Sequence, residues 1–414
     1  MSRVRYNGRT QLHDLHVPTG PDGSIYAQTF LIPASYPIYF TNDVFNPSNP
    51  CLLQAVTHAE SSRRHRLFAI IDHGVLKARP HLSNNLTAYV NHHERHMELT
   101  ALPYLVPGGE RSKNDPNFPA RLQKRLYQLN IDRQSIVLIV GGGAVLDMVG
   151  YAAATTHRGV RVIRLPTTVL SQGDGGLGVK NGINAFGVKN FLGTFAVPFA
   201  IVNDAQFIDT LPARHRTSGM AEAVKVALIR DASFFDWLEA NTSALSNFEP
   251  SALAHLIHHS AEIHLGHIAS SGDPFESGSA RPLDFGHWAA HKLETLSGYR
   301  LHHGEAVAIG MAIDSRYSTE IGLLSEVSCE QILDLLDRLK LPSWHRTLDL
   351  KDPDGRLKIL RGLDEFKEHI GGELTITLLK KIGQGTEVGQ IDHAVIHRAL
   401  SWLRKRHASR CVSR

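Results

Sequence analysis

A short apolar segment that runs directly into three consecutive glycines limits the folds open to this 414-residue chain. Residues 135–140, Ser-Ile-Val-Leu-Ile-Val, are typical of a buried strand, and Gly141-Gly142-Gly143 ends it. Residues 147–154 then predict a helix. Further strand-like segments at 37–40 and 66–72 have helical runs between and after them. Strands that alternate with helices indicate an α/β layer structure around a parallel sheet.

The pattern changes after Asp204, where long helical runs replace the alternation. These runs occupy residues 219–240, 251–268, 285–297, 304–321 and 328–339. We therefore expect two domains, an α/β domain over residues 1–205 and an all-α domain over residues 206–414. Within the first domain, residues 1–35 predict a loose arm followed by a strand. Residues 115–129 predict an amphipathic helix with Asp115 as its N-cap and Pro116 at its first position.

Composition and charge argue against several classes of protein. The length suits two or three domains, and 42% hydrophobic with 20% charged residues is usual for a soluble globular enzyme. The net charge of +4 is small and no dense basic stripe is present, so we expect no nucleic acid partner. The three cysteines lie far apart, which suits a reducing cytoplasm. Without a signal-like N-terminus or a membrane-length apolar run, we expect a cytoplasmic protein with no membrane partner.

Histidines and glutamates in the second half are candidate metal ligands. His287, His291 and Glu294 are spaced i, i+4 and i+7, which places them on one face of a helix. His303 opens the next helical run, and Glu222 lies in a helical segment upstream. Neutral imidazole is a preferred zinc ligand, so packed helices could bring these groups together. The alternative is that they are ordinary surface histidines, because the chain contains 25 of them.

Two glycine-rich segments are candidate phosphate sites. A strand, a glycine triplet and a helix suit a diphosphate, because glycine lets phosphate approach the backbone and helix N-termini attract anions. The triplet is not the Gly-x-Gly-x-x-Gly fingerprint, and a simple tight turn is the alternative. Residues 174–190 form a second glycine-rich segment that carries Lys180, Lys189 and Asn190. Apolar residues alternate with the polar ones there, which favours a packed loop over a solvated, mobile one.

Several motifs follow one another in a fixed order. Residues 107–113 read Pro-Gly-Gly-Glu-Arg-Ser-Lys, residues 166–168 Pro-Thr-Thr, and residues 221–225 Ala-Glu-Ala-Val-Lys. With the glycine triplet and the histidines, they resemble the sugar phosphate cyclase superfamily, whose best-known member is 3-dehydroquinate synthase. The resemblance covers roughly residues 38–400, and an ordered set of motifs is far more specific than any one of them.

This resemblance implies an NAD-binding Rossmann-like domain over 1–205 and a helical metal-binding domain over 206–414, with the active site in the cleft and usually a homodimer. It implies zinc, or cobalt, held by Glu222, His287 and His303. The residues that match the NAD contacts are Asp72, Glu110, Lys113, Gly142, Gly143, Asp147, Thr167, Thr168 and Lys189. The predicted catalytic residues are Asp174, Lys180, Lys225, Asp284 and His291. The predicted contacts to the substrate and its phosphate are Arg158, Lys180, Asn190, His291 and Lys367.

The chain departs from 3-dehydroquinate synthase just before the first metal histidine. That enzyme carries Arg-x-x-Leu-Asn there, whereas this chain has Ala280 in place of the arginine that grips the substrate carboxylate and Asp284 in place of the asparagine. A carboxylate-binding lysine is also missing, and His264 or His267 lies in its region. Losing a guanidinium and gaining a carboxylate disfavours an anionic keto acid. Arg281, one position away, could compensate in part.

The pattern Arg-Pro-x-Asp-Phe-Gly-His, with residues 365–372 later on, is more similar to the sedoheptulose 7-phosphate cyclases. We therefore expect a lyase that converts sedoheptulose 7-phosphate into a valiolone-type cyclitol of secondary metabolism. The implied steps are transient oxidation by NAD, β-elimination of phosphate, reduction and an intramolecular aldol reaction. The alternatives are 3-dehydroquinate synthase itself, a metal-dependent polyol dehydrogenase, or a non-catalytic binding protein of the same fold.

Overall fold

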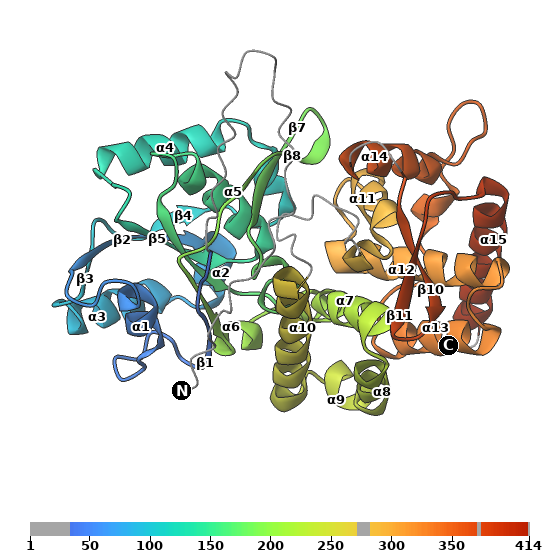
Figure 1. The fold of residues 1–414 in the computed structure, drawn as a ribbon, viewed down its shortest axis with the longest axis horizontal. Coiled ribbons are helices and arrows are strands. Elements are labelled where there is room, and N and C mark those ends of the chain that lie inside the picture. The colour runs from blue at the N-terminus through green and yellow to red at the C-terminus, as the bar shows by residue number, and fades with distance from the viewer. Residues whose placement is uncertain (1–33, 271–281, 371–373, 413–414) are drawn as a thin grey trace, which may run out of the picture. The chain divides into compact units, whose positions relative to one another are not determined.

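The first half of the chain is built around a parallel sheet (Figure 1). The computed structural model describes residues 34–270, 282–370 and 374–412. The predictions for residues 1–33 and for Ala280 and Arg281 lie outside the described residues. Residues 36–414 form one compact unit. Its main sheet has the order β1-β9-β6-β5-β2-β3, and β4 also pairs with β2. The strands are β1 (Ile38–Thr41), β2 (His65–Asp72), β3 (Met97–Leu99), β4 (Tyr104–Val106), β5 (Ile136–Gly141), β6 (Arg161–Pro166) and β9 (Ala200–Asp204).

All pairs in this sheet are parallel, so the carboxyl ends of its strands share one edge. The chain leaves β2 toward β3 and β4 on one side and returns to β5 on the other. Ligands of open α/β sheets bind at such a reversal, outside the carboxyl ends of the strands. Asp72 and the glycine triplet therefore lie at the edge where a ligand is expected.

Both faces of the sheet are covered, because apolar side chains of its central strands point to each face. In β2, Leu67, Ala69 and Ile71 pack in the core on one face, and Phe68 and Ile70 pack in the core on the other. The first core includes residues of α1 (Cys51–Thr57) and α3 (Leu82–His92), and the second those of α4 (Phe118–Gln128) and α5 (Gly143–Ala154). The predicted α/β layer structure is confirmed.

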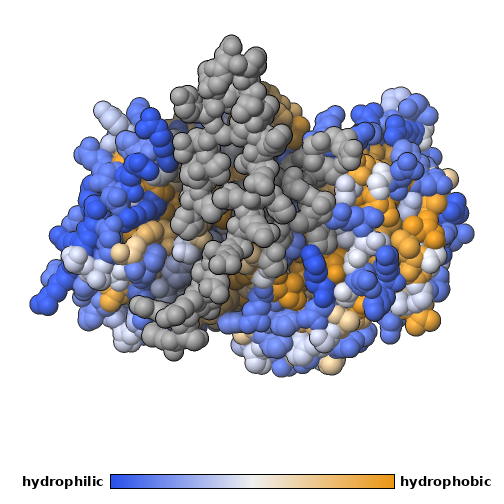
Figure 2. Space-filling model, viewed as in Figure 1, coloured by the Kyte–Doolittle hydropathy of each residue, from blue (hydrophilic) through white to orange (hydrophobic). Residues whose placement is uncertain are grey.

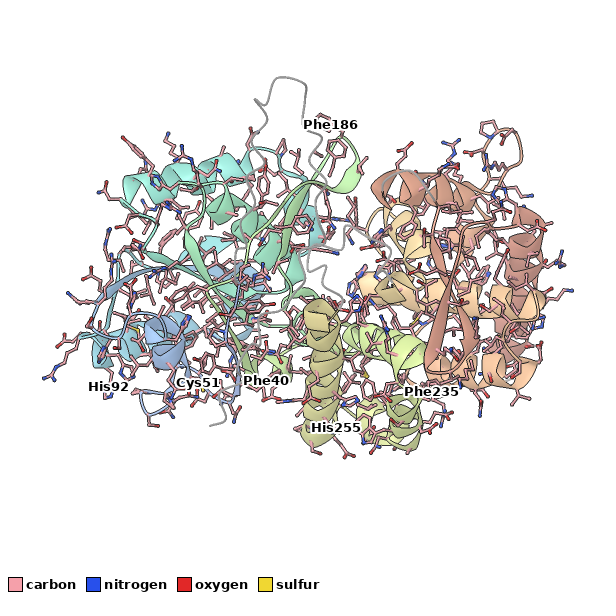
Figure 3. The ribbon with its side chains drawn as sticks, in the orientation of Figure 1. Phe40, Cys51, His92, Phe186, Phe235 and His255 are labelled. Atoms are coloured by element: carbon pink, nitrogen blue, oxygen red, sulfur yellow. The ribbon has the colours of Figure 1, made fainter. Side chains whose placement is uncertain are left out.

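The segment predicted as a glycine-rich loop contains an antiparallel hairpin, β7 (Lys180–Ala185) and β8 (Val188–Phe195), after a short π-helical turn, η2 (Ser171–Gly175). The hairpin packs closely on α5, since a Cβ at Gly150 would lie 1.9 Å from Asn181 Oδ1. Phe186 at its tip is 87% exposed (Figure 3). Elsewhere on the face shown in Figure 2, polar residues predominate over the described part of the chain, with apolar residues in patches between them.

The second half is helical. Its helices are α6 (Gln206–Asp209), α7 (Ala213–Arg230), α8 (Ala232–Ala240), α9 (Thr242–Ser246), α10 (Pro250–Ser270), α11 (His287–Leu296), α12 (His303–Glu320), α13 (Glu326–Arg338), α14 (Arg361–Ile370) and α15 (His393–Val412). Nearly every residue of α12 is buried, so this helix is the centre of the domain. A hairpin of β10 (Ile376–Lys381) and β11 (Gln384–Val388) joins the helices, so the predicted all-α domain is helical with one added hairpin.

Three predicted helices have different bounds in the structure. The helix predicted over residues 147–154 begins earlier, at Gly143. Asp115 does not cap a helix; its carboxylate accepts a hydrogen bond from the Asn117 backbone in a turn, and α4 begins at Phe118. The run 219–240 is two helices, because Asp231 has extended backbone and its carboxylate caps α8 by accepting from the Phe234 amide at 3.0 Å. Among the described residues, no helix is long and apolar enough to cross a membrane.

Candidate metal and cofactor site

A cavity of about 2050 Å³ opens at the carboxyl edge of the main sheet and is lined by residues from both halves of the chain. It gathers most of the predicted site residues. The lining includes Asp72, Glu110, Lys113, Gly142, Gly143, Asp147, Thr167, Thr168, Asp174, Lys180, Lys189, Asn190, Lys225, Asp284, His287, His291 and His303. Such a volume is large enough for a dinucleotide and a small substrate together.

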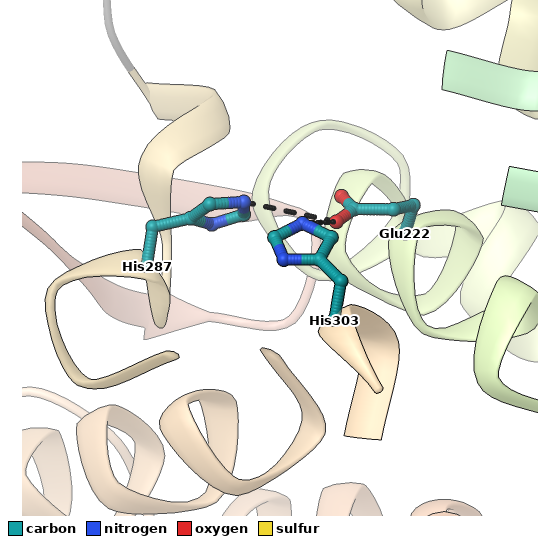
Figure 4. Close-up of side chains that lie close together, drawn as sticks. All are labelled: Glu222, His287 and His303. Carbon is teal, nitrogen blue, oxygen red and sulfur yellow. Dashed lines mark ion pairs between the residues drawn. The ribbon is translucent and has the colours of Figure 1, made fainter. Parts of the chain in front are cut away.

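Glu222, His287 and His303 come together at this cavity from three helices (Figure 4). One ligand atom from each lies within 4.8 Å of the others. The Glu222 Oε1 atom is 3.3 Å from His303 Nε2 and 3.7 Å from His287 Nε2. Two histidine nitrogens and one carboxylate, with a fourth position left for solvent or substrate, make up the donor set of catalytic zinc sites. The residues predicted as metal ligands are therefore adjacent and fit zinc.

The local backbone sets the direction of these ligands. His287 is the first residue of α11 and follows Gly286, whose φ of 78° lies in the left-handed region. A Cβ at Gly286 would lie 2.6 Å from the Met311 nitrogen. Both the positive φ and this close approach therefore require glycine at this position. The His287 Nδ1 atom lies 3.1 Å from the Phe285 carbonyl oxygen, to which it donates, and this leaves Nε2 to face Glu222.

Burial and neighbouring charges set the protonation of the three candidate metal ligands. Burial lowers the pKa of His287 well below its usual value, so its ring is neutral. Burial alone would raise the pKa of Glu222, but the Lys225 ammonium and His303 outweigh it and lower that pKa. Burial and Lys189 act to lower the pKa of His303, yet contacts with Glu294 and Glu222 raise it to about 9. A metal would therefore displace a proton from His303, as is usual for protein metal ligands.

Lys225 connects the metal ligands to the predicted substrate side. It forms an ion pair with Glu222 at 2.5 Å, and its Nζ atom lies 3.5 Å from Asp174 Oδ2. Asp174 Oδ1 is 3.6 Å from His264 Nδ1. The sequence offered either His264 or His267 in the region of the missing lysine. In the structure His264 lines the cavity, whereas His267 contacts Arg230.

The carbonyl groups of the glycine-rich segment are held by a buried arginine that sequence analysis missed. Arg164 in β6 is only 2% exposed and donates to the carbonyl oxygens of Gly176 at 3.1 Å and Gly178 at 2.7 Å, and to Asn181 Oδ1 at 2.8 Å. Hydrogen bonds with a charged donor are stronger than neutral ones, so Arg164 fixes the path between Asp174 and Lys180. The sequence around Arg164 is typical of a buried strand, and its charge was the only sign that this residue has another role.

The predicted nucleotide side has the shape that a diphosphate needs. Gly142 is the N-cap of the twelve-residue helix α5, which begins at Gly143, and a Cβ at Gly143 would meet no atom within 4 Å. Open space at the N-terminus of a helix suits an anion. A Cβ at Gly108 would lie 2.4 Å from the Asp72 carboxylate oxygens, so Gly108 allows the close approach of these two segments. Lys113 is buried and forms an ion pair with Asp147 at 2.9 Å.

Two predicted phosphate contacts do not reach the cavity within one chain. Arg158 lies in an exposed turn before β6, at the end of the sheet opposite the cavity. Lys367 is exposed on α14 and does not line the cavity, although its neighbours Phe366 and Glu368 do. Lys189, predicted as a cofactor contact, lines the cavity and pairs with Glu294.

Comparison with known proteins agrees with this geometry. The family described as 3-dehydroquinate synthase N-terminal matches residues 103–218, and the one described as 3-dehydroquinate synthase C-terminal matches residues 219–359. The 3-dehydroquinate synthase of Halorhodospira halophila is 39% identical over 266 residues, which are 64% of this chain and 73% of that protein. That of Xylella fastidiosa is 33% identical over 353 residues, 84% of this chain and 89% of the relative.

A solved structure is similar over nearly the whole chain. It is ValA, the 2-epi-5-epi-valiolone synthase of Streptomyces hygroscopicus subsp. jinggangensis, with NAD⁺ and Zn²⁺ bound. The match has a TM-score of 0.81 and 29% identity, and covers 92% of this chain and 100% of ValA. The chain therefore belongs to the 3-dehydroquinate synthase-like sugar phosphate cyclases, a family of phosphate-eliminating carbon–oxygen lyases.

Proposed function

We propose that the chain is a sugar phosphate cyclase that takes sedoheptulose 7-phosphate, releases phosphate and forms a valiolone-type C7 cyclitol. The observation that carries this substrate is Asp284, a carboxylate that lines the cavity near Lys225. Burial acts to lower the pKa of Lys225, and the carboxylates of Glu222, Asp174 and, least of the three, Asp284 raise it. An additional carboxylate in this cavity repels the carboxylate of an anionic keto acid and tolerates a neutral polyol chain. His264, which lies in the region of the missing lysine, lines the same cavity.

We propose that the cofactors are NAD⁺ and zinc, with cobalt as the alternative metal. ValA contains NAD⁺ and Zn²⁺, and the donor set of Glu222, His287 and His303 suits such a metal. When bound, NAD⁺ supplies a transient hydride acceptor and the metal supplies a Lewis acid for the substrate hydroxyl. The open N-terminus of α5 and the Asp72 carboxylate would hold the diphosphate and the ribose of the nucleotide.

The remaining residues orient the substrate and handle its protons. Lys225 is held by two carboxylates, Glu222 and Asp174, so it presents a fixed positive charge beside the reacting hydroxyl. A fixed positive charge there lowers the pKa of that hydroxyl and favours removal of its proton. Asp174 can accept a hydrogen bond from a neighbouring substrate hydroxyl. Lys180 and Asn190, which line the cavity on the hairpin, would bind the phosphate before and after it leaves.

The second candidate is 3-dehydroquinate synthase itself, and specific observations favour it. The curated relatives with 33% to 40% identity carry that name. Arg281, which lies outside the described residues, is the sequence-based candidate for a contact with the substrate carboxylate of that enzyme. The homodimer, the domain boundary at residue 205 and the role in secondary metabolism stay predictions.

Asp284→Asn is expected to change the substrate preference. Replacing the carboxylate by an amide removes a like charge from the cavity, so the ratio of kcat/KM for the 3-dehydroquinate synthase substrate to kcat/KM for sedoheptulose 7-phosphate should rise on the order of tenfold. Phosphate release from each substrate measures this ratio, and Asp284→Glu, which keeps the charge, is the matched control. An unchanged ratio in Asp284→Asn would show that this position does not select the substrate.

A further inference from the structure

We propose that Lys189 and Glu294 form a positioning pair that orients the metal ligand His303 and links the β7–β8 hairpin to the metal site. Neither residue belongs to the group of three ligands, Glu222, His287 and His303. Glu294 on α11 is 2% exposed, and both of its carboxylate oxygens accept hydrogen bonds from Lys189 Nζ at 2.9 Å. Its Oε2 atom also accepts from His303 Nδ1 at 3.1 Å. The inference rests on the proposed metal site.

These contacts give the two ring nitrogens of His303 different roles. Nδ1 keeps its hydrogen and donates it to Glu294, so Nε2 is the nitrogen that can bind a metal, and it is the one that lies 3.3 Å from Glu222 Oε1. A carboxylate behind a ligating histidine fixes its tautomer and ring orientation and makes it a better ligand. The helix α11 thus carries one metal ligand, His287, and the group that orients another.

Each negative charge beside His303 is balanced by a lysine. Two buried carboxylates flank His303, and each has its own lysine, because Lys225 pairs with Glu222 and Lys189 pairs with Glu294. A buried carboxylate without such a partner would be costly. Lys189 therefore allows Glu294 to stay ionised behind the histidine.

Lys189 also brings the hairpin into this arrangement. It lies near the start of β8, 105 residues before Glu294 in the chain. The next residue, Asn190, lines the cavity, and its backbone nitrogen donates to Asn184 Oδ1 at 2.9 Å within the hairpin. A contact that holds Lys189 on Glu294 therefore holds Asn190 at the cavity. If metal binding tightens His303 against Glu294, the hairpin becomes more ordered, and by reciprocity an ordered hairpin strengthens metal binding.

The test compares zinc affinity in the full-length protein, measured by competition with a chromogenic chelator at one pH. Glu294→Gln keeps the size of the side chain and removes its charge, and we expect about 10- to 100-fold weaker zinc binding. Lys189→Met should weaken zinc binding in the same direction, and Lys189→Arg, which can still donate two hydrogen bonds, should restore most of it. Glu239→Gln is the matched control, because it breaks an ion pair with Arg338 outside the cavity.

Hydrogen exchange of the β8 amides gives a second measurement that a merely structural role would not affect. Zinc should slow exchange in the wild type and in Lys189→Arg, and should have little effect on it in Lys189→Met. Wild-type zinc affinity in both Glu294→Gln and Lys189→Met would overturn the positioning role. Zinc-independent exchange in the wild type would overturn the link to the hairpin. A wild type that binds no zinc would instead contradict the proposed function, so the two failures are distinct.

Discussion

His287→Ala is expected to remove the bound metal and the phosphate-releasing activity together. The substitution leaves only Glu222 and His303 of the ligand group, and His287 is buried with its Nε2 atom already turned toward Glu222. Two protein ligands hold zinc poorly. Because Lewis-acid stabilisation contributes several kcal/mol, we expect the rate to fall by about three orders of magnitude. Metal content per chain and phosphate release, measured on the same preparation, check this result.

His291→Ala is the informative control for this experiment. His291 lies one turn further along α11, and its ring centroid is 5.5 Å from that of His287, but it is not part of the ligand group. Its loss should reduce activity while the metal stays bound. Stoichiometric zinc in His287→Ala, or loss of zinc in His291→Ala alone, would contradict the assignment of the ligands.

Gly304→Ala is expected to destabilise the protein and weaken the metal site through packing alone. A Cβ at this position would lie 1.8 Å from the Ser218 carbonyl oxygen, so α7 and α12 would have to move apart. Glu222 lies one turn after Ser218 on α7, and His303 directly precedes Gly304. Overpacking of a buried contact costs about 1–3 kcal/mol, and here the displaced helices carry two of the ligands.

Thermal unfolding with and without zinc measures both effects of Gly304→Ala. We expect a lower melting temperature and a smaller increase on adding zinc than in the wild type. Gly266→Ala is the matched control, because a Cβ at Gly266 on α10 would meet no atom within 4 Å and alanine is the better helix former. Equal melting curves for Gly304→Ala and the wild type would show that the contact between α7 and α12 relaxes without cost.

Local patterns in the sequence predicted the sheet and the long helices well, and they made His287 and His303 candidate metal ligands with Glu222 as a candidate third. The full set of three ligands was implied by the family resemblance. Apolar strands such as β2 and β5 are recognisable because both faces of the sheet are buried. The spacing of His287 and His291, with His303 opening the next helix, is a local signal of helices that face one another. The hairpin β7–β8 was missed because each of its strands contains a glycine and several polar residues, which obscure the alternation of a strand.

Long-range contacts account for what sequence analysis could not predict at the site. Glu294 was visible on the same helix face as His287, but its partner Lys189 is 105 residues away and was assigned to the cofactor by resemblance. Arg164 lies between apolar residues in β6, and its hydrogen bonds to the following loop depend on the folded path of that loop. Arg158 matched a motif in sequence, yet the direction of β6 carries it to the far end of the sheet. A local sequence pattern does not show which distant residues come into contact.

Phosphate release by the zinc- and NAD⁺-loaded wild type tests the central claim most directly. Sedoheptulose 7-phosphate and the 3-dehydroquinate synthase substrate are offered in parallel, and the absorbance of NADH is followed at the same time. We predict release from sedoheptulose 7-phosphate alone, without accumulation of NADH, and a C7 cyclitol in the NMR spectrum of the product. Release from the keto acid alone would contradict this account and identify a 3-dehydroquinate synthase, whereas stoichiometric NADH without phosphate would identify a polyol dehydrogenase.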